Sequence, residues 1–272
     1  MRVAVAMVVA SHPVPTGAVT ALAVVLAAGV GAAGPTVSLI GLAVLTGQLS
    51  VGWSNDWIDA ERDRVAGRRD KPAVTGAVTP AQLRGAAWGA AAACVVASLA
   101  TGLRPGLLHV AAVASAWGYN AGLKRTAGSW LPYAVSFGLL TAFVVVAAGG
   151  TVPVVLVAAG SLLGTGAHVL NVLPDLDDDD ATGVRGLPHR MGRRGSAVAA
   201  PTVLAAAVVL VALGAVGRSG TVVAAAVLGG AVAVLAGVLA VVRPTSRVPF
   251  VLSMAVAAAC VALMVTAGPD LA

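Results

Sequence analysis

Ten of the eleven acidic residues of the chain fall into two short clusters. The first cluster contains Asp56 and also Asn55, Asp59 and Asp63. The last three follow one another at spacings of four, which places their side chains on one face of a helix. Carboxylates one turn apart repel each other unless a cation lies between them. Hard oxygen ligands suit Mg²⁺, which normally binds through few carboxylates together with water and substrate phosphates. The first cluster therefore predicts a magnesium site, and the alternative is a solvated helix end with ion pairs such as Glu61 with Arg64.

The second cluster repeats this pattern more than a hundred residues later. His168, Asn171, Asp175 and Asp179 follow one another at spacings of three, four and four, again on one helical stripe. Pro174 is expected to bend or loosen the helix where the acids begin. His168 alone fits either a structural hydrogen-bonding group or a catalytic one. An acidic run is often only a solvated loop, but its pairing with the first cluster favours a second set of metal ligands.

Basic side chains accompany both clusters. Arginine and lysine next to carboxylates can bind phosphate oxygens, although the same residues would also anchor a membrane protein on its cytoplasmic side. After the first cluster these are Arg64, Arg68, Arg69 and Lys71, and around the second they are Arg185, Arg190, Arg193 and Arg194.

Long apolar runs must position the two clusters. Only 10% of the residues are charged, against about 25% in soluble domains, and the mean hydropathy is +0.94. Each run is long enough to cross a bilayer as a helix. We predict an all-α integral membrane protein with a bundle of about nine transmembrane helices, forming a single domain over residues 1–272. The expected spans are 17–34, 37–54, 84–103, 106–121, 131–149, 152–173, 197–217, 221–242 and 248–267.

The distribution of charge predicts the orientation. With a cytoplasmic N-terminus and nine spans, 15 of the 17 basic residues lie on the cytoplasmic side, and only Arg104 and Arg218 lie outside. The net charge of +6 thus follows from topology, and no nucleic-acid partner is expected. Spans two and six run in the same direction, so both acidic clusters should meet at the cytoplasmic face of the cell membrane.

The remaining features are structural. Residues 1–10 are apolar but too short to span a membrane, and a break is expected at residues 12–15. The segment lacks the layout of a signal peptide, so we expect the first span to be kept in the mature protein. Cys94 and Cys260 each lie inside a predicted span, which indicates buried core residues rather than a disulfide.

Both clusters resemble motifs of the UbiA superfamily of intramembrane prenyltransferases. Residues 55–63 match NDxxDxxxD, the first motif of that superfamily. Residues 175–179, followed by Gly183, are similar to its second motif, DxxxD, and Asn171 stands where the family often has asparagine. Residues 119–126 resemble the family's tyrosine-to-lysine segment after the fourth span. We call residues 55–63 the first motif and residues 175–179 the second motif.

The resemblance implies a Mg²⁺-dependent reaction of an allylic prenyl diphosphate. Asp59, Asp175 and Lys124 would be catalytic, and Mg²⁺ would be held by Asn55, Asp56, Asp59, Asp63, Asp175 and Asp179. The diphosphate would be bound by Arg64, Lys71, Lys124 and Arg125. The substrate pocket would include Gln48, Trp53, Tyr119, His168 and Asn171, with Trp57, Trp117 and Tyr133 as further candidates for its walls.

The chain also departs from the family pattern. Pro174 stands where a basic residue commonly precedes the second motif, Asp180 where one often follows it, and His12 where the family has an arginine near the start. The resemblance implies transfer to a lipophilic or aromatic acceptor of the quinone-precursor type. A terpene cyclase using the same diphosphate site is an alternative. A divalent-cation transporter is a third, disfavoured because the acids lie at span ends rather than near the midplane.

Overall fold

The computed structural model describes residues 3–214 and 220–267, and all of its regular elements are helices. The two shortest, η1 and η2, are 3₁₀-helices. In chain order the elements are α1 (Val3–Ala10), α2 (Pro13–Gly29), α3 (Gly34–Ile58), α4 (Ala60–Val65), α5 (Pro80–Ala100), α6 (Leu103–Ala121), η1 (Leu123–Arg125), α7 (Leu131–Ala147), α8 (Val154–Val172), η2 (Leu173–Asp175), α9 (Leu176–Ala181), α10 (Leu187–Gly214), α11 (Gly220–Val242) and α12 (Val248–Ala267).

Each predicted span coincides with one long helix, but five of these helices begin three or more residues earlier than expected: α2, α3, α5, α6 and α10. α2 starts at Pro13 rather than at residue 17, and α3 starts at Gly34 rather than at residue 37. Proline is favoured in the first turn of a helix, where its missing N–H has no intrahelical partner, so these prolines begin helices instead of delaying them. Residues 215–217 of the seventh predicted span, together with Arg2, Arg218 and Asp270, lie outside the described residues.

Length and hydropathy support a multi-pass membrane protein. Within the described residues, six helices are long and apolar enough to cross a membrane, or seven if α1 and α2 form one span with a bend of 63°. α7 is apolar but shorter, with 17 residues. The number of about nine spans stays a prediction.

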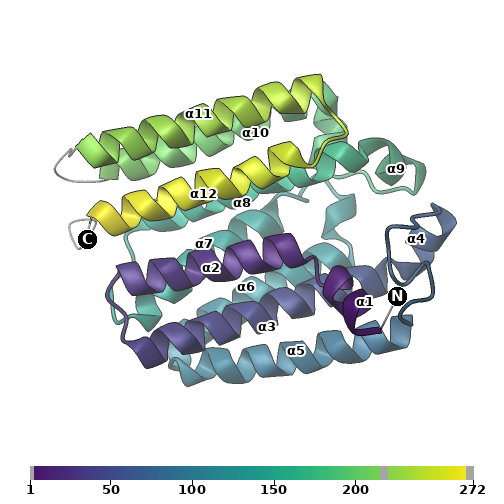
Figure 1. Ribbon diagram of the computed structural model, residues 1–272, viewed down its shortest axis with the longest axis horizontal. Coiled ribbons are helices and arrows are strands. Elements are labelled where there is room, and N and C mark those ends of the chain that lie inside the picture. Colours follow the sequence, from purple (N-terminus) through teal and green to yellow (C-terminus); the bar gives the residue numbers. More distant parts are fainter. Residues whose placement is uncertain (1–2, 215–219, 268–272) are drawn as a thin grey trace.

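The long helices lie side by side around an apolar core. α3 packs against α2 and α5, α8 packs against α7 and α10, and α11 packs against α12. Figure 1 shows that α1, α4 and α9 all lie at one end of this bundle, whereas the α2–α3 link lies at the opposite end. The acidic clusters belong to α3–α4 and to η2–α9, so the fold brings both to the same end, as their sequence positions predict.

Small residues permit the closest helix contacts. A Cβ atom on Gly164 of α8 would lie 2.5 Å from the carbonyl oxygen of Tyr133 on α7. Glycine at this position therefore lets the two backbones approach, as is common between membrane helices. The approach brings Tyr133 beside the end of α8 that carries His168.

Both acidic segments lie at interruptions of their helices. α3 ends at Ile58 and α4 begins at Ala60, although the backbone hydrogen bonds Asp59 N to Asn55 O and Asp63 N to Asp59 O continue the helical pattern. α8 ends at Val172, and Pro174 follows inside η2 before α9 begins. The helix is thus loosened into a 3₁₀ turn at Pro174, where the second motif begins.

Candidate active site

Asp59 is at the centre of a buried cluster of charges. Its carboxylate accepts hydrogen bonds from Lys124 Nζ at 2.6 and 2.5 Å and from Arg62 NH2 at 2.9 Å. The Asp59 and Lys124 side chains are only 2% and 5% exposed. Lys124 comes from η1, immediately after α6, so the tyrosine-to-lysine segment is brought directly against the first motif. Burial lowers the pKa of Lys124, while the charge of Asp59 opposes that effect.

Asp56 forms a second charge cluster on another side of α3. Its Oδ1 accepts a hydrogen bond from Lys71 Nζ at 2.7 Å and lies 3.0 Å from His12 Nε2. His12 has a φ of 54°, the only positive φ of a non-glycine residue in the described segments. That conformation is costly for a side-chain-bearing residue, and it places the ring over Asp56. In the sequence His12 stands where the family has an arginine, and no local pattern predicts its contact with Asp56.

Asp63 completes the acids of the first motif. Its side chain is buried, with Arg62 NH2 3.7 Å from Oδ1. Burial raises the pKa of Asp63, and the nearby charge of Asp59 adds to the rise. Because Arg62 compensates this buried carboxylate only in part, Asp63 is well suited to bind a metal cation.

The second motif is tied to the first by arginines. Asp175 accepts hydrogen bonds from Arg247 NH2 at 2.8 and 2.7 Å, and Arg68 NH1 lies 3.9 Å from its Oδ1. Arg247 follows α11, and Arg68 follows the first motif. Neither was assigned to the site from the sequence, although Arg68 was noted as a possible phosphate ligand. Arg68 also pairs with Asp70 at 2.9 Å, so it lies between the two acidic clusters.

The other acids of the second cluster differ in exposure. Asp177 pairs with Arg193 at 2.7 Å and Asp180 pairs with Arg185 at 2.5 Å, both as solvent-exposed pairs. Asp179 is half-buried, and its Oδ2 lies 3.8 Å from His189 Nε2. Asp175 and Asp179 are therefore the two acids of this cluster that face the bundle, as the stripe of spacings predicts.

An aromatic group lies at the same end of the bundle as these charges. Tyr119 of α6 meets Tyr133 of α7 edge to face, with ring centroids 5.2 Å apart. His168 of α8 lies 5.5 Å from the Tyr119 ring and 4.8 Å from the Tyr133 ring. Asn171 Nδ2 is 3.5 Å from Tyr133 Oη. Tyr119, His168 and Asn171 thus lie together with Tyr133, and their role in a substrate pocket stays a prediction.

Other predicted site residues lie apart from this group. Arg64 forms an exposed pair with Glu61 at 2.6 Å, and Arg125 is exposed beside Lys124. Trp53 donates from Nε1 to the carbonyl oxygen of Met7 at 2.9 Å and packs against α1. Gln48 is half-buried on α3, two turns before Asn55. The structure does not gather these four around the acids, and their assigned roles stay predictions.

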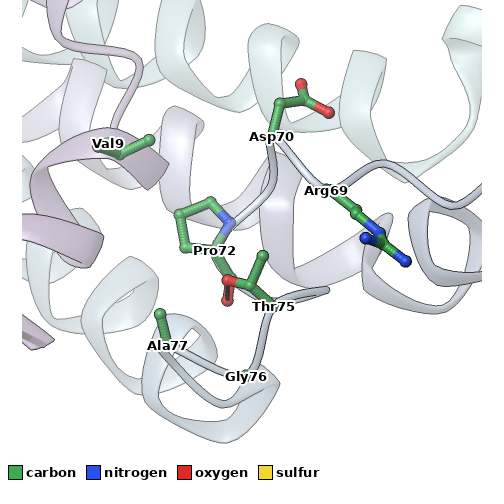
Figure 2. A pocket seen from close by; sticks show the side chains of 7 residues that line it. All are labelled: Val9, Arg69, Asp70, Pro72, Thr75, Gly76 and Ala77. Atoms are coloured by element: carbon green, nitrogen blue, oxygen red, sulfur yellow. Dashed lines mark hydrogen bonds between the residues drawn. The ribbon is translucent and has the colours of Figure 1, made fainter. Parts of the chain in front are cut away.

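A hollow beside the site has a different lining. Figure 2 shows it between α1 and the link from α4 to α5, with Val9, Arg69, Asp70, Pro72, Thr75, Gly76 and Ala77 around it. Asp70 pairs with Arg68 at 2.9 Å, which lowers the pKa of Asp70. None of the predicted metal ligands lines this hollow.

The donor chemistry fits Mg²⁺ bound together with a diphosphate. Asp56 Oδ2 is buried without a hydrogen-bond partner, and such an oxygen is available to a hard cation. The described residues contain no group of three His, Cys, Asp or Glu side chains close enough to enclose a metal. A carboxylate or two from each motif, completed by phosphate oxygens and water, is the arrangement that Mg²⁺ usually adopts.

Comparisons with known proteins agree with this geometry. The model of the UbiA prenyltransferase family matches residues 16–259. A UbiA homologue from Archaeoglobus fulgidus, solved with GPP and Mg²⁺, is 16% identical, covers 95% of this chain and 99% of its own, and has a TM-score of 0.75. An apo UbiA homologue from Aeropyrum pernix K1 is 22% identical, covers 98% of each chain and has a TM-score of 0.73.

A third solved structure is also similar to this chain. A structure described as that of digeranylgeranylglyceryl phosphate synthase is 16% identical, covers 98% of this chain and 97% of its own, and has a TM-score of 0.66. No curated protein matches the chain. At these identities the solved structures show the fold. The family model covers most of the chain, and the chain therefore belongs to the UbiA prenyltransferase family.

Proposed function

We propose that this protein is a Mg²⁺-dependent intramembrane prenyltransferase that moves an allylic prenyl group from its diphosphate to a lipophilic or aromatic acceptor of the quinone-precursor type. The observation that carries the proposal is the meeting of both motifs at one end of the bundle, where Lys124 pairs with Asp59, Arg68 approaches Asp175, and a cavity lined by Tyr119 lies beside them. The solved homologues that contain GPP or DMAPP with Mg²⁺ support this choice of substrate and metal.

Each part of the site has a role in this reaction. Asn55, Asp56, Asp59 and Asp63 would hold the metal on one side, with Asp175 and Asp179 on the other. Bound Mg²⁺ would neutralise the charge that develops on the departing diphosphate. Lys124 and Lys71, already held against acids of the first motif, supply fixed positive charge to the same oxygens.

The aromatic group would guide the prenyl cation. The faces of Tyr119 and Tyr133 attract positive charge, and the surrounding apolar helices exclude water that would otherwise capture the cation. A long prenyl chain could extend between the helices towards lipid. In this proposal the chain acts as a single domain. Substrate binding would have to rearrange the site before Arg64 and Arg125 contact the diphosphate, or Gln48 and Trp53 contact the prenyl chain.

Diphosphate release from geranyl diphosphate by purified protein tests the proposal. Asp59→Asn and Asp175→Asn should each lower the Mg²⁺-dependent rate by about 100-fold or more, since each removes charge stabilisation at the leaving group. Glu61→Gln is the matched control, because Glu61 lies in the same segment but pairs with Arg64 in solvent. The control should keep the wild-type rate.

The products then decide between related reactions. Release that requires an added aromatic acceptor supports the transferase, whereas release with a hydrocarbon or terpene alcohol as product supports a cyclase. Absence of Mg²⁺-dependent release from geranyl and geranylgeranyl diphosphate by folded protein would reject the diphosphate reading. Metal uptake into vesicles would then test the transporter.

We also propose that the site opens to the cytoplasm from the cell membrane, because the basic residues gather at its end of the bundle. In a variant without Cys94 and Cys260, Arg69→Cys should react with an impermeant thiol reagent only in inverted membrane vesicles. Gly150→Cys, at the link between α7 and α8, should react only in intact cells. The opposite pattern would reverse the orientation.

A further inference from the structure

A small cavity lies directly behind the charge cluster of the first motif. Its lining comes from α6, η1, α8, α9 and the start of α10, and its polar members are Tyr119, Lys124, Ser129, His168, Asp179 and His189. Lys124 and Asp179 connect it to the diphosphate site, and Tyr119 connects it to the aromatic group. The cavity therefore lies between the diphosphate site and the aromatic group.

Buried ring nitrogens at this cavity lack partners. His168 is 1% exposed, and its Nδ1 is buried with no hydrogen bond. Both ring nitrogens of His189 are likewise buried without a hydrogen bond. Buried polar groups are normally hydrogen-bonded, so several unpaired nitrogens around one cavity indicate that a ligand or a transferred proton completes them.

The other nitrogen of His168 is fixed by Ser129. His168 Nε2 lies 3.0 Å from Ser129 Oγ, which also accepts a hydrogen bond from the backbone N–H of Leu187 at 2.9 Å. A hydroxyl oxygen has two lone pairs, so Ser129 Oγ can accept from both Leu187 N–H and a His168 Nε2–H. In the tautomer in which Nε2–H donates to Ser129 Oγ, Nδ1 keeps its lone pair, and a ring protonated at both nitrogens would retain this bond to Ser129.

We propose that His168 Nδ1 is the general base that takes the proton released when the acceptor captures the prenyl cation, an inference that rests on the proposed function. His168 is preferred to His189 because His189 lies beside Asp179 of the second motif, on the metal side of the cavity. His168 instead lies against Tyr119 and Tyr133, which line the path of the cation.

The step balances without any additional reactant. The bond between C1 of the prenyl group and the diphosphate oxygen breaks, and its electron pair leaves with the diphosphate. An electron pair of the acceptor, from an aromatic ring or a hydroxyl oxygen, forms the new bond to C1. The proton on the attacking atom passes to His168 Nδ1, its bonding pair stays with the acceptor, and the imidazolium then gives the proton to the departing diphosphate.

The test compares His168→Gln with His109→Gln. His109 is a matched control because it is also buried within the bundle, on α6, and also bonds a serine, with Nδ1 2.7 Å from Ser98 Oγ, but it does not line the cavity. Labelled geranyl diphosphate with Mg²⁺ serves as donor. The acceptors are 4-hydroxybenzoate, 1,4-dihydroxy-2-naphthoate and a prenylglyceryl phosphate, and diphosphate and prenylated product are measured together.

His168→Gln should bind geranyl diphosphate as the wild type does and should release diphosphate within about threefold of the wild-type rate. Its yield of prenylated product per diphosphate should fall by about 100-fold or more, with allylic alcohol in its place, because general-base catalysis contributes about that much. His109→Gln should keep the wild-type yield. A purely structural role for His168 would lower both products together and would overturn the inference, as would an unchanged yield.

Further outcomes separate this inference from the proposed function. No Mg²⁺-dependent diphosphate release by the wild type rejects both. If the wild type releases diphosphate but prenylates none of the acceptors, the proton must instead be lost from the prenyl cation itself. His168→Gln should then give allylic alcohol in place of hydrocarbon. Equal hydrocarbon yields from the two proteins would overturn this inference but not the proposed function. If His168→Gln does not fold, Ser129→Ala, which removes the partner of Nε2, should lower the product yield per diphosphate, and an unchanged yield again overturns it.

Discussion

The Lys124 ammonium group is buried against the Asp59 carboxylate, so each charge depends on the other for its stability. Removing one partner of a buried pair leaves an uncompensated charge, whereas removing both can be nearly neutral. Without metal, Lys124 thus holds Asp59 in place, and the same ammonium group lies at the proposed diphosphate site. Arg125, the next residue, is exposed and provides an internal comparison.

Lys124→Gln should destabilise the metal-free protein by about 3 kcal/mol, because the buried Asp59 charge would lose its shortest ion pair and keep the pair with Arg62. Arg125→Gln should change the stability by less than about 0.5 kcal/mol. Thermal unfolding in detergent measures both. Adding Asp59→Asn to Lys124→Gln should recover most of the lost stability while leaving the protein inactive. Equal unfolding curves for the Lys124 and Arg125 variants would contradict the buried-pair interpretation.

Unlike Asp59, whose charge is compensated by Lys124, the Asp63 carboxylate is destabilised by burial, which raises its pKa. A group with a raised pKa in the folded state binds its proton more tightly there, so its contribution to stability is present at low pH and is lost as pH rises through the folded pKa. At neutral pH the buried carboxylate is therefore destabilising. Asp63→Asn should raise the Tm of the metal-free protein at pH 7.5 and should abolish the Tm increase caused by Mg²⁺.

Asp70 gives the control for that prediction, because its hydrogen bond from Arg68 lowers its pKa. Asp70→Asn should slightly lower the Tm at neutral pH and should keep the increase with Mg²⁺. Since Asp70 is largely exposed, its effect should be small. An Asp63→Asn protein that is less stable than the wild type at pH 7.5 would show that the carboxylate is already compensated without metal.

At the scale of elements, α3 and the link between α1 and α2 meet without room for a side chain. A Cβ atom on Gly52 would lie 2.7 Å from the carbonyl oxygen of Ser11, which is backbone and cannot rotate away. Ser11 precedes His12, the residue whose ring contacts Asp56. The glycine on α3 thus allows the break between α1 and α2 to lie against the first motif.

Gly52→Ala should therefore push the α1–α2 break away from α3 and weaken the His12–Asp56 contact. The expected loss is about 1–3 kcal/mol of stability, typical of overpacking, together with a lower kcat/KM for the prenyl diphosphate. Gly89→Ala on α5 is the control, because a Cβ atom there meets nothing within 4 Å and alanine favours the helix. Similar kinetics for the two variants would show that α1 does not position the site.

The sequence predicted the helices and both acidic stripes because apolar length and a spacing of four are local properties. It also predicted the break at Pro174. It assigned Arg64 to the diphosphate, although helical phase distinguishes the arginines: Arg62 is three residues after Asp59 and pairs with it, while Arg64 is three residues after Glu61. The contacts made by His12 and Arg247 join residues 44 and 72 apart, and nothing local in the chain predicts such pairings.

Across the whole molecule, the second motif is held by a residue from the far end of the chain. Arg247, in the link between α11 and α12, bonds both oxygens of Asp175 and the carbonyl oxygen of Asn171 at 3.1 Å. Arg68 approaches the same carboxylate from the first-motif side. The two acidic segments and the last helices of the bundle are thereby coupled, so that binding of metal at Asp175 must alter contacts in three parts of the chain.

Arg247→Gln tests this coupling. A guanidinium on both oxygens of Asp175 competes with Mg²⁺ for that carboxylate, so the variant should bind Mg²⁺ more tightly in the absence of diphosphate, as measured by calorimetry. Its kcat/KM for geranyl diphosphate should nevertheless fall by about tenfold, because a displaced arginine next to the site stabilises phosphate charge. Arg243→Gln, an exposed arginine on the same link, should change neither value. If Arg247→Gln leaves the Mg²⁺ affinity unchanged and lowers only kcat/KM, Asp175 does not ligate the metal, and the second motif must bind it through Asp179.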